Sequence, residues 1–208
     1  MKLVVAKEPL GRILKWAQRA LWVCAVVLLG YSGFVLVDAW AFQRREGMDL
    51  DRLLSDRRAA SEGTPVSATN GLIGRMVIPR LGLSAVVVEG IGRTTLRRGV
   101  GHIPGTALPG EPGNVGLSGH RDTFFRPLKD LRIKDEIQFS TLKGDFKYEV
   151  ESLRVVEPRS VGVLASSKEN VLTLVTCYPF FYIGAAPRRF VVRARQVSPQ
   201  ALARASVK

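Results

Sequence analysis

The hydrophobic pattern begins with one long apolar run. Residues 20–37 read ALWVCAVVLLGYSGFVLV, eighteen positions without a charge, and aromatic residues extend the run to Phe42. That length is about the minimum for crossing the core of a bilayer. Basic residues precede the run and mixed charges follow it, so the positive-inside rule predicts a single-pass membrane anchor over 20–42. Residues 1–19 are then a cytoplasmic basic segment, and the chain after the anchor is extracytoplasmic.

Two other interpretations of the apolar run stay open. Ala39-Trp40-Ala41 fits the small-x-small pattern of a signal-peptide cleavage site, although the run is longer than the apolar region of most signal peptides. A buried core helix is the second alternative, but the length, the position and the basic flank argue against it. With either an anchor or a cleaved signal, the remaining chain is exported.

The pattern changes twice after the apolar run. Residues 43–70 are polar and charged, with a hint of a short helix around Leu50, Leu53 and Leu54, and this segment is predicted to be a juxtamembrane linker. From Gly71 onward, short runs of β-forming residues alternate with Gly and Pro. The runs cover residues 74–79, 84–90, 114–119, 136–141, 146–157, 170–177 and 189–197.

This spacing of short strands predicts an all-β domain over residues 71–198, folded as a closed or nearly closed β-barrel of seven or eight strands. Helical turns are expected near Thr95 and over 163–167. The segment 101–114 is rich in Gly and Pro and is predicted to be a shaped loop. Residues 199–208 are a C-terminal tail.

Charge narrows the possible partners. The net charge is +13, and such a basic surface suits nucleic acid, anionic lipid or an acidic wall polymer. Export of the domain removes nucleic acid from this set and leaves the membrane and the wall.

The chain has two cysteines, and they lie on different sides of the predicted membrane boundary. Cys24 is inside the apolar run and Cys177 ends the run 170–177, so the two cannot pair. A lone exported thiol is buried and inert, joined to another chain, or reactive.

Three residues at the ends of predicted strands suit acyl transfer: Cys177, His120 and Arg189. A thiolate is a nucleophile, an imidazole can accept and return its proton, and a guanidinium can stabilise an oxyanion without titrating. His102 has the same chemistry as His120 but lies in a turn-like segment. The competing arginines are Arg188, Arg193 and Arg195. The spacing of these groups fits no ordinary metal site, and no cofactor is expected.

Three segments resemble the sortases, which are membrane-anchored cysteine transpeptidases, and most closely the class D type. TLVTC at 173–177 is similar to the family signature that ends on the nucleophile. GHRDTFF at 119–125 resembles the segment with the catalytic histidine, and APRRFVVRA at 186–194 resembles the strand that begins with the catalytic arginine. The family pattern places an alanine five positions after this arginine, which selects Arg189. The resemblance covers about residues 73–197.

The resemblance implies a specific reaction on secreted proteins that carry C-terminal sorting signals. Cys177 would attack the Thr–Gly bond of an LPxTG-like signal, and an amine of a wall precursor or of another protein would resolve the thioester. His120 would act as acid and base, Arg189 would hold the substrate and the oxyanion, and Thr176 would contact the substrate. The acidic loop clusters of calcium-assisted members have no counterpart in the sequence, so no metal is assigned.

Two other functions remain as alternatives. One is a different exported cysteine enzyme, such as an L,D-transpeptidase-like cross-linker or a papain-like peptidase, but the sequence motifs of both are missing. The other is an anchored, non-catalytic β-barrel that binds wall polymer through its basic surface. In that case Cys177 would be dispensable.

Overall fold

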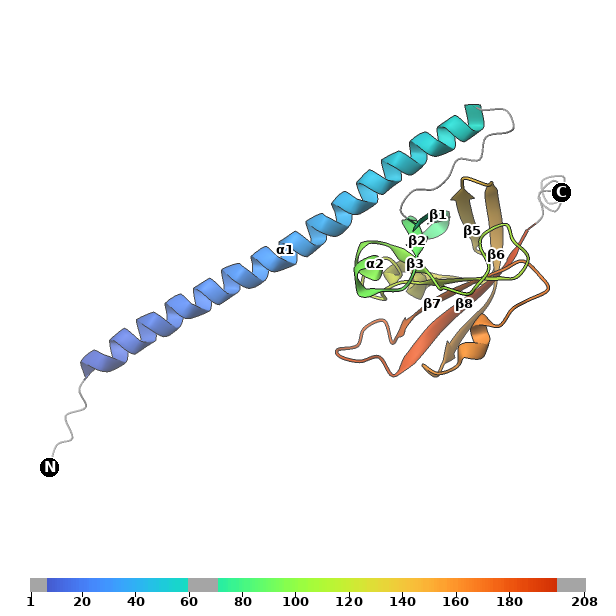
Figure 1. Ribbon diagram of the computed structural model, residues 1–208. Helices are drawn as coiled ribbons and strands as arrows, with labels where there is room; N and C mark the ends of the chain where they lie inside the picture. The colour runs from blue at the N-terminus through green and yellow to red at the C-terminus, as the bar shows by residue number, and fades with distance from the viewer. Residues whose placement is uncertain (1–6, 60–70, 198–208) are drawn as a thin grey trace. The chain divides into compact units, whose positions relative to one another are not determined.

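The computed structural model describes residues 7–59 and 71–197 (Figure 1). The predicted C-terminal tail, residues 1–6 of the predicted cytoplasmic segment and residues 60–70 of the predicted linker lie outside the described residues. The chain divides into two compact units, residues 1–41 and residues 42–208.

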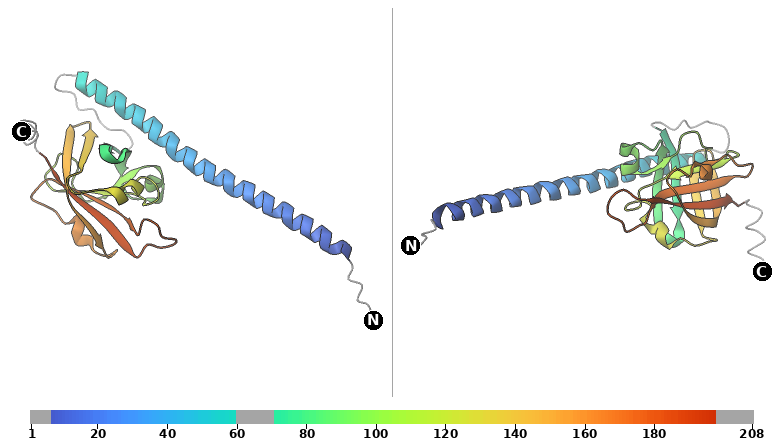
Figure 2. Two further views of the ribbon diagram at one scale, coloured as in Figure 1. Left: turned by 180° about the vertical axis from the view of Figure 1, so that it is seen from behind. Right: turned by 90° about the horizontal axis from the view of Figure 1, so that it is seen from below.

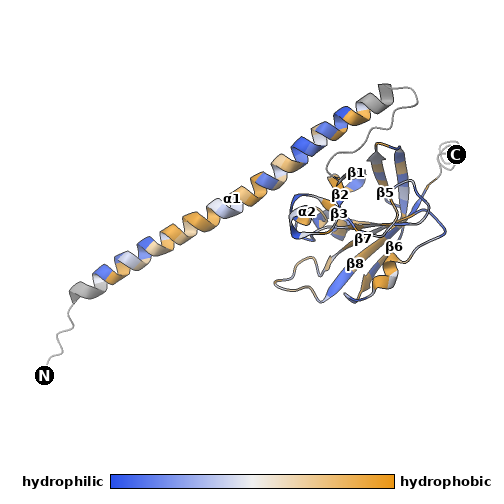
Figure 3. Cartoon of the chain, in the orientation of Figure 1, coloured by the Kyte–Doolittle hydropathy of each residue, from blue (hydrophilic) through white to orange (hydrophobic). Residues whose placement is uncertain are grey.

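One long helix, α1 (Lys7–Ala59), contains the apolar run (Figure 3). Within the described residues, Gly11–Ser55 is long and apolar enough to cross a membrane, by length and composition. The helix continues over residues 43–59, where the sequence pattern indicated only a short helix. This part lacks proline and has a single glycine, Gly47, so little in it opposes the helical conformation.

The last turns of α1 belong to the second unit and pack on its β-strands. Leu50 is fully buried and Leu54 nearly so, against the apolar side chains of Leu72, Val86 and Val88. The removal of this apolar surface from water stabilises the contact between helix and barrel.

Polar contacts accompany this apolar contact. The Gln43 amide accepts a hydrogen bond from the backbone N–H of Val86 at 3.0 Å and donates one to the carbonyl of Arg98 at 2.6 Å. Arg75 forms an ion pair with Asp51 at 2.9 Å. The side chain of Gln43 therefore links two backbone segments of the barrel.

Eight strands form a closed barrel in the order β1-β2-β3-β4-β7-β8-β6-β5, with β5 pairing back to β1 (Figure 1). The pairs β2–β3 and β4–β7 are parallel, and the others are antiparallel. The strands are β1 (Leu72–Ile78), β2 (Leu83–Glu89), β3 (Val100–His102), β4 (Asn114–Ser118), β5 (Glu136–Thr141), β6 (Asp145–Val156), β7 (Val171–Tyr178) and β8 (Arg188–Gln196). The predicted all-β closed barrel is confirmed.

The seven expected strands all form, and β3 is the strand that the sequence pattern missed. It has three residues, too few to show an alternating pattern, and its pairing comes from β2 and β4 on either side. Its middle residue must be glycine because a Cβ at Gly101 would lie 2.3 Å from the carbonyl oxygen of Gly90.

Four short helices connect the strands. They are η2 (Pro79–Leu81), α2 (Arg93–Arg98), η3 (Arg126–Asp130) and η4 (Val161–Leu164). The turn expected near Thr95 is α2, and the turn expected over 163–167 begins two residues earlier as η4. Between β7 and β8 the chain forms a loop that extends beyond the strands in the views of Figure 2.

The barrel core follows the two-residue period of the strands. Leu172 and Leu174 of β7, and Val192 and Ala194 of β8, are buried in the core cluster. Because successive side chains of a strand point to opposite faces, the residues between them lie on the outer face. Cys177 is on this outer face.

Candidate active site

The strand register gathers three of the predicted site residues at one end of the barrel. Parallel pairing sets Ser118 of β4 beside Val175 of β7, and the N–H of Gly119 donates to the carbonyl of Val175 at 3.3 Å. His120, two residues after the end of β4, is therefore level with Cys177, the residue before the last of β7. On the other side of β7, antiparallel pairing places Arg189 directly opposite Cys177.

Each of these three residues is at least partly exposed. Cys177 and Arg189 are partly buried, and His120 is exposed. Arg189 shares the outer face of β8 with Val191, because Val192 and Ala194 point into the core. The register therefore places Cys177 between His120, two residues after β4, and Arg189 of β8.

The guanidinium of Arg189 is held by backbone carbonyls. Its Nη1 donates to Ala186 at 3.2 Å and to Arg188 at 3.0 Å, both near the end of the β7–β8 loop. The competing arginines have acidic neighbours. Arg188 lies 4.0 Å from Glu157, Arg193 lies 3.7 Å from Glu151, and Arg195 lies 2.5 Å from Glu151.

The structure places Thr176 differently from the other predicted residues. Thr176 is 3% exposed, and its hydroxyl donates to the carbonyl of Gly119 at 2.7 Å. The alternation along β7 turns this side chain inward, away from the face of Cys177. The bond ties β7 to the residue before His120, so it fixes the segment that carries the histidine.

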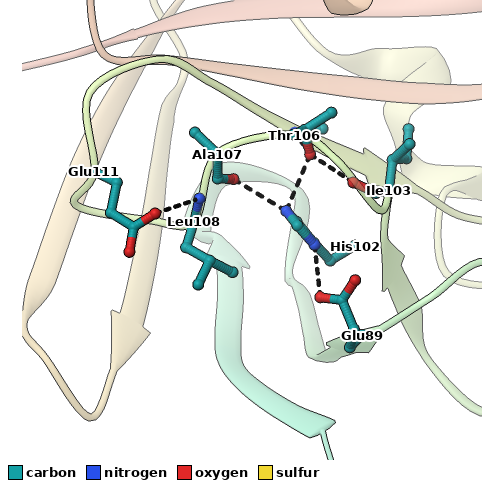
Figure 4. Close-up of polar contacts among 8 residues, drawn as sticks. Glu89, His102, Ile103, Thr106, Ala107, Leu108 and Glu111 are labelled. Carbon is teal, nitrogen blue, oxygen red and sulfur yellow. Dashed lines mark hydrogen bonds and ion pairs between the residues drawn. The ribbon is translucent and has the colours of Figure 1, made fainter.

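His102 lies away from Cys177 and is enclosed. It pairs with Leu117 of β4 and is therefore level with Leu174, three residues or roughly 10 Å before Cys177 along the strand direction. The ring is 3% exposed, and Nδ1 lies 2.7 Å from a carboxylate oxygen of Glu89 (Figure 4).

The other ring nitrogen of His102 also faces acceptors. Nε2 lies 3.0 Å from the carbonyl of Ala107 and 3.0 Å from the hydroxyl of Thr106, whose proton goes to the carbonyl of Ile103 (Figure 4). Each ring nitrogen therefore lies within hydrogen-bond distance of an oxygen that accepts, the Glu89 carboxylate on one side and the Ala107 carbonyl on the other. His102 thus holds the loop 103–113 in place.

The same loop is fastened at a second point. Glu111 accepts a hydrogen bond from the N–H of Leu108 at 3.3 Å (Figure 4). It also forms an ion pair with Lys143 at 3.0 Å. The hydrogen bond from Lys143, followed by that from Leu108, holds the pKa of Glu111 below its usual range. The Gly- and Pro-rich segment predicted from the sequence is therefore a fixed loop.

A cavity of about 220 Å³ opens on the same outer face as Cys177. Thr173, at its floor, lies four residues from Cys177, roughly 13 Å along β7. Residues of η4, β6, β7 and β8 surround the cavity, namely Ser152, Arg154, Gly162, Val163, Thr173, Val191 and Arg193. The sequence pattern does not predict this cavity, because strand pairing and η4 together create it.

Asn114 holds η4 beside this cavity. The side chain is 2% exposed, its amide donates to Val163 at 3.1 Å and to Ala165 at 3.2 Å, and its oxygen accepts from the Thr173 hydroxyl at 2.7 Å. A buried amide needs such partners. The position of Asn114, a polar residue at the start of the apolar run 114–119, was the one sequence signal that this side chain holds η4.

Comparisons with known proteins agree with this geometry. The model of the sortase domain matches residues 76–197. Sortase D of Bacillus subtilis (strain 168) is 30% identical over 186 residues, covering 83% of this chain and 93% of that protein.

Solved structures are also similar. A Clostridium perfringens sortase D5 transpeptidase gives a TM-score of 0.64 at 27% identity and covers 76% of this chain and 99% of its own. Sortase C-1 from Actinomyces oris gives a TM-score of 0.59 at 26% identity, and the match covers 73% of this chain and 99% of the Actinomyces oris chain. The matched residues contain all three motifs of the sequence analysis, and the resemblance is confirmed: the chain belongs to the sortase family of cysteine transpeptidases.

Proposed function

We propose that this chain is a membrane-anchored transpeptidase that cleaves an LPxTG-like sorting signal between Thr and Gly and transfers the acyl part to an amine. The observation that carries the proposal is the register at the barrel end. Cys177 is opposite Arg189 on one side and level with His120 on the other. Three chemically different groups thus border one open surface.

In the proposed first step, the Cys177 sulfur attacks the threonine carbonyl carbon and His120 protonates the departing glycine amine. The C–N bond breaks and a C–S thioester remains. In the second step, an amine of a wall precursor or of another protein attacks the thioester, His120 accepts a proton from this amine, and the thiolate leaves. The amide formed replaces the amide broken, so no external energy source is needed.

Arg189 is proposed to stabilise the negative oxygen of both tetrahedral intermediates. A guanidinium has five N–H donors, and both described contacts of Arg189 use Nη1. Charge-assisted donors aimed at such an oxygen contribute strongly to catalysis.

The cavity beside η4 is proposed to receive the N-terminal end of the signal. Four extended residues span about 13–14 Å, which matches the separation of roughly 13 Å between Thr173 and Cys177. Because Thr176 faces inward, we propose that it positions the His120 segment and that the outer face of β7 contacts the substrate.

The apolar part of α1 is proposed to anchor the chain as a single-pass segment with a cytoplasmic N-terminus. The basic residues Lys7, Arg12, Lys15 and Arg19 precede the apolar run, which favours this orientation. The barrel then meets secreted proteins and wall amines outside the membrane.

The test is a transfer reaction with the full-length protein in detergent. An LPxTG peptide and an amine acceptor should give the threonyl-linked product with wild type and with Cys24→Ala, the matched cysteine control, but not with Cys177→Ala. Peptide binding without turnover would favour a non-catalytic barrel. Cleavage of unrelated peptides would indicate a peptidase of another kind.

A further inference from the structure

Arg121 follows His120 directly, and its side chain bonds to three backbone carbonyls of another segment. Nη1 donates to Pro179 at 3.0 Å, and Nη2 donates to Tyr182 at 2.6 Å and to Gly184 at 3.2 Å. The guanidinium carbon also lies 5.8 Å from the ring centre of Tyr182. One side chain therefore holds three points of the β7–β8 loop.

Phe180 packs against the core, but the residues after it in this loop have little apolar burial to hold them. Phe181 is 72% exposed, Tyr182 is 47% exposed and Ile183 is 101% exposed. A segment with few buried apolar contacts opens easily unless polar bonds fix it. The three bonds from Arg121 therefore account for much of its order.

The same loop carries the carbonyl that receives Arg189. Ala186 accepts the hydrogen bond from Arg189 Nη1 at 3.2 Å, two residues after the carbonyl of Gly184 that Arg121 holds. The contacts run from the His120 segment through Arg121 and the loop to the guanidinium of Arg189. Cys177 lies between the two ends of this path.

We propose that Arg121 is a positioning residue of the active site, which fixes the β7–β8 loop and thereby the place of Arg189 relative to Cys177 and His120. The catalytic part of this inference rests on the proposed function. The contact itself depends only on Arg121 and on backbone carbonyls.

The geometry needs arginine at this position. The planar guanidinium donates from two nitrogens to carbonyls of three different residues, whereas lysine offers one compact ammonium group. Arg121→Lys keeps the charge but loses the two guanidinium nitrogens that donate to the three carbonyls. We therefore expect the loop in Arg121→Lys to be nearly as disordered as in Arg121→Ala.

The first measurement is hydrogen exchange in the full-length protein in detergent. In Arg121→Ala the amides of residues 180–186 should exchange about tenfold faster or more, while those of β1 and β2 stay unchanged. Arg121→Lys should resemble Arg121→Ala. The control, Arg132→Ala, removes an exposed arginine that precedes β5 and should leave exchange in the loop unchanged.

The second measurement is the kinetics of peptide transfer. When Arg189 is displaced, it should stabilise the transition state less well while substrate binding changes little. In Arg121→Ala we therefore expect kcat to fall about 10- to 100-fold and KM to change less than about threefold. Arg132→Ala should stay within about twofold of wild type. A global unfolding effect would lower the melting temperature and speed exchange in every strand.

The outcomes separate the two proposals. If wild type transfers no acyl group, the proposed function fails, and loop exchange alone decides whether Arg121 holds the loop. Unchanged loop exchange in Arg121→Ala overturns the inference. Faster loop exchange with unchanged kcat in an active enzyme overturns the positioning role. If Arg121→Ala does not fold, the same criteria apply to Arg121→Lys.

Discussion

The two histidines of this chain show how surroundings determine what a side chain can do. His120 is exposed and lies two residues after β4, where the register of β4 with β7 makes it level with Cys177. His102 is 3% exposed, with Glu89 on one nitrogen and the loop 103–113 on the other. An exposed imidazole can exchange protons with a substrate, whereas an enclosed one with both nitrogens bound stabilises its loop.

Substitution by alanine should therefore lower mainly the activity at His120 and mainly the stability at His102. His120→Ala should lower kcat about 100-fold or more, with a change in the free energy of unfolding below about 0.5 kcal/mol. His102→Ala should lower the free energy of unfolding by about 1–3 kcal/mol, because it removes a buried ring and the hydrogen bonds with which that ring holds the loop 103–113. Urea denaturation and peptide transfer check both variants, and equal effects on stability would contradict the assignment.

At this scale the sequence indicates candidate catalytic residues but not the contacts that hold them. The motif TLVTC and the strand ends indicated Cys177 and His120, and the family pattern was needed to choose Arg189 over its neighbours. The contacts of Arg121 and Thr176 could not be predicted from the sequence. The acceptors of Arg121 are backbone carbonyls 58 to 63 residues away, and Thr176 bonds to a carbonyl 57 residues away, so neither contact has a local sequence signature.

At the scale of elements, the end of α1 is part of the barrel's support. Leu50 has no exposed surface and packs with Leu72, Val86 and Val88, while Met48, two residues before it, is 48% exposed. Helical periodicity turns these two positions to different sides. The helix end therefore has one face on the strands and one in solvent.

Truncation of the buried leucine should weaken the second unit. Leu50→Ala should lower the free energy of unfolding by about 2–4 kcal/mol through lost burial and a cavity, and Met48→Ala should change it by less than about 0.5 kcal/mol. Denaturation of the full-length variants in detergent, followed by the near-ultraviolet signal of the barrel tyrosines, measures both. A Leu50→Ala variant as stable as wild type would show that α1 does not support the barrel.

Long strands with a regular alternation of apolar and polar residues were predicted more accurately than short ones. The run 136–141 coincides with β5, and the twelve residues of β6 agree to within one position. β3 was missed because a strand of three residues has no alternation to read, and its existence depends on pairing with β2 and β4. The helical end of α1 was only partly expected, because a mixed charge pattern is also typical of linkers.

At the scale of the whole molecule, the order of the strands brings the candidate site residues together. Residues 120, 177 and 189 are distant in sequence, and two strand pairings, β4 with β7 and β7 with β8, bring them to one end. Patterns along the chain predicted the barrel but not its strand order, which follows from pairings between distant segments. The same order places the cavity beside η4 on the face of Cys177.

The central claim is that the Cys177 sulfur takes up the acyl part of a sorting signal. Intact-mass spectrometry of the full-length protein, incubated with an LPxTG peptide and no added amine, tests it most directly. We expect a mass gain equal to the peptide up to its threonine, located on Cys177 by fragmentation and removed by hydroxylamine. A protein that forms product with no adduct, or with the adduct on another residue, would contradict the account.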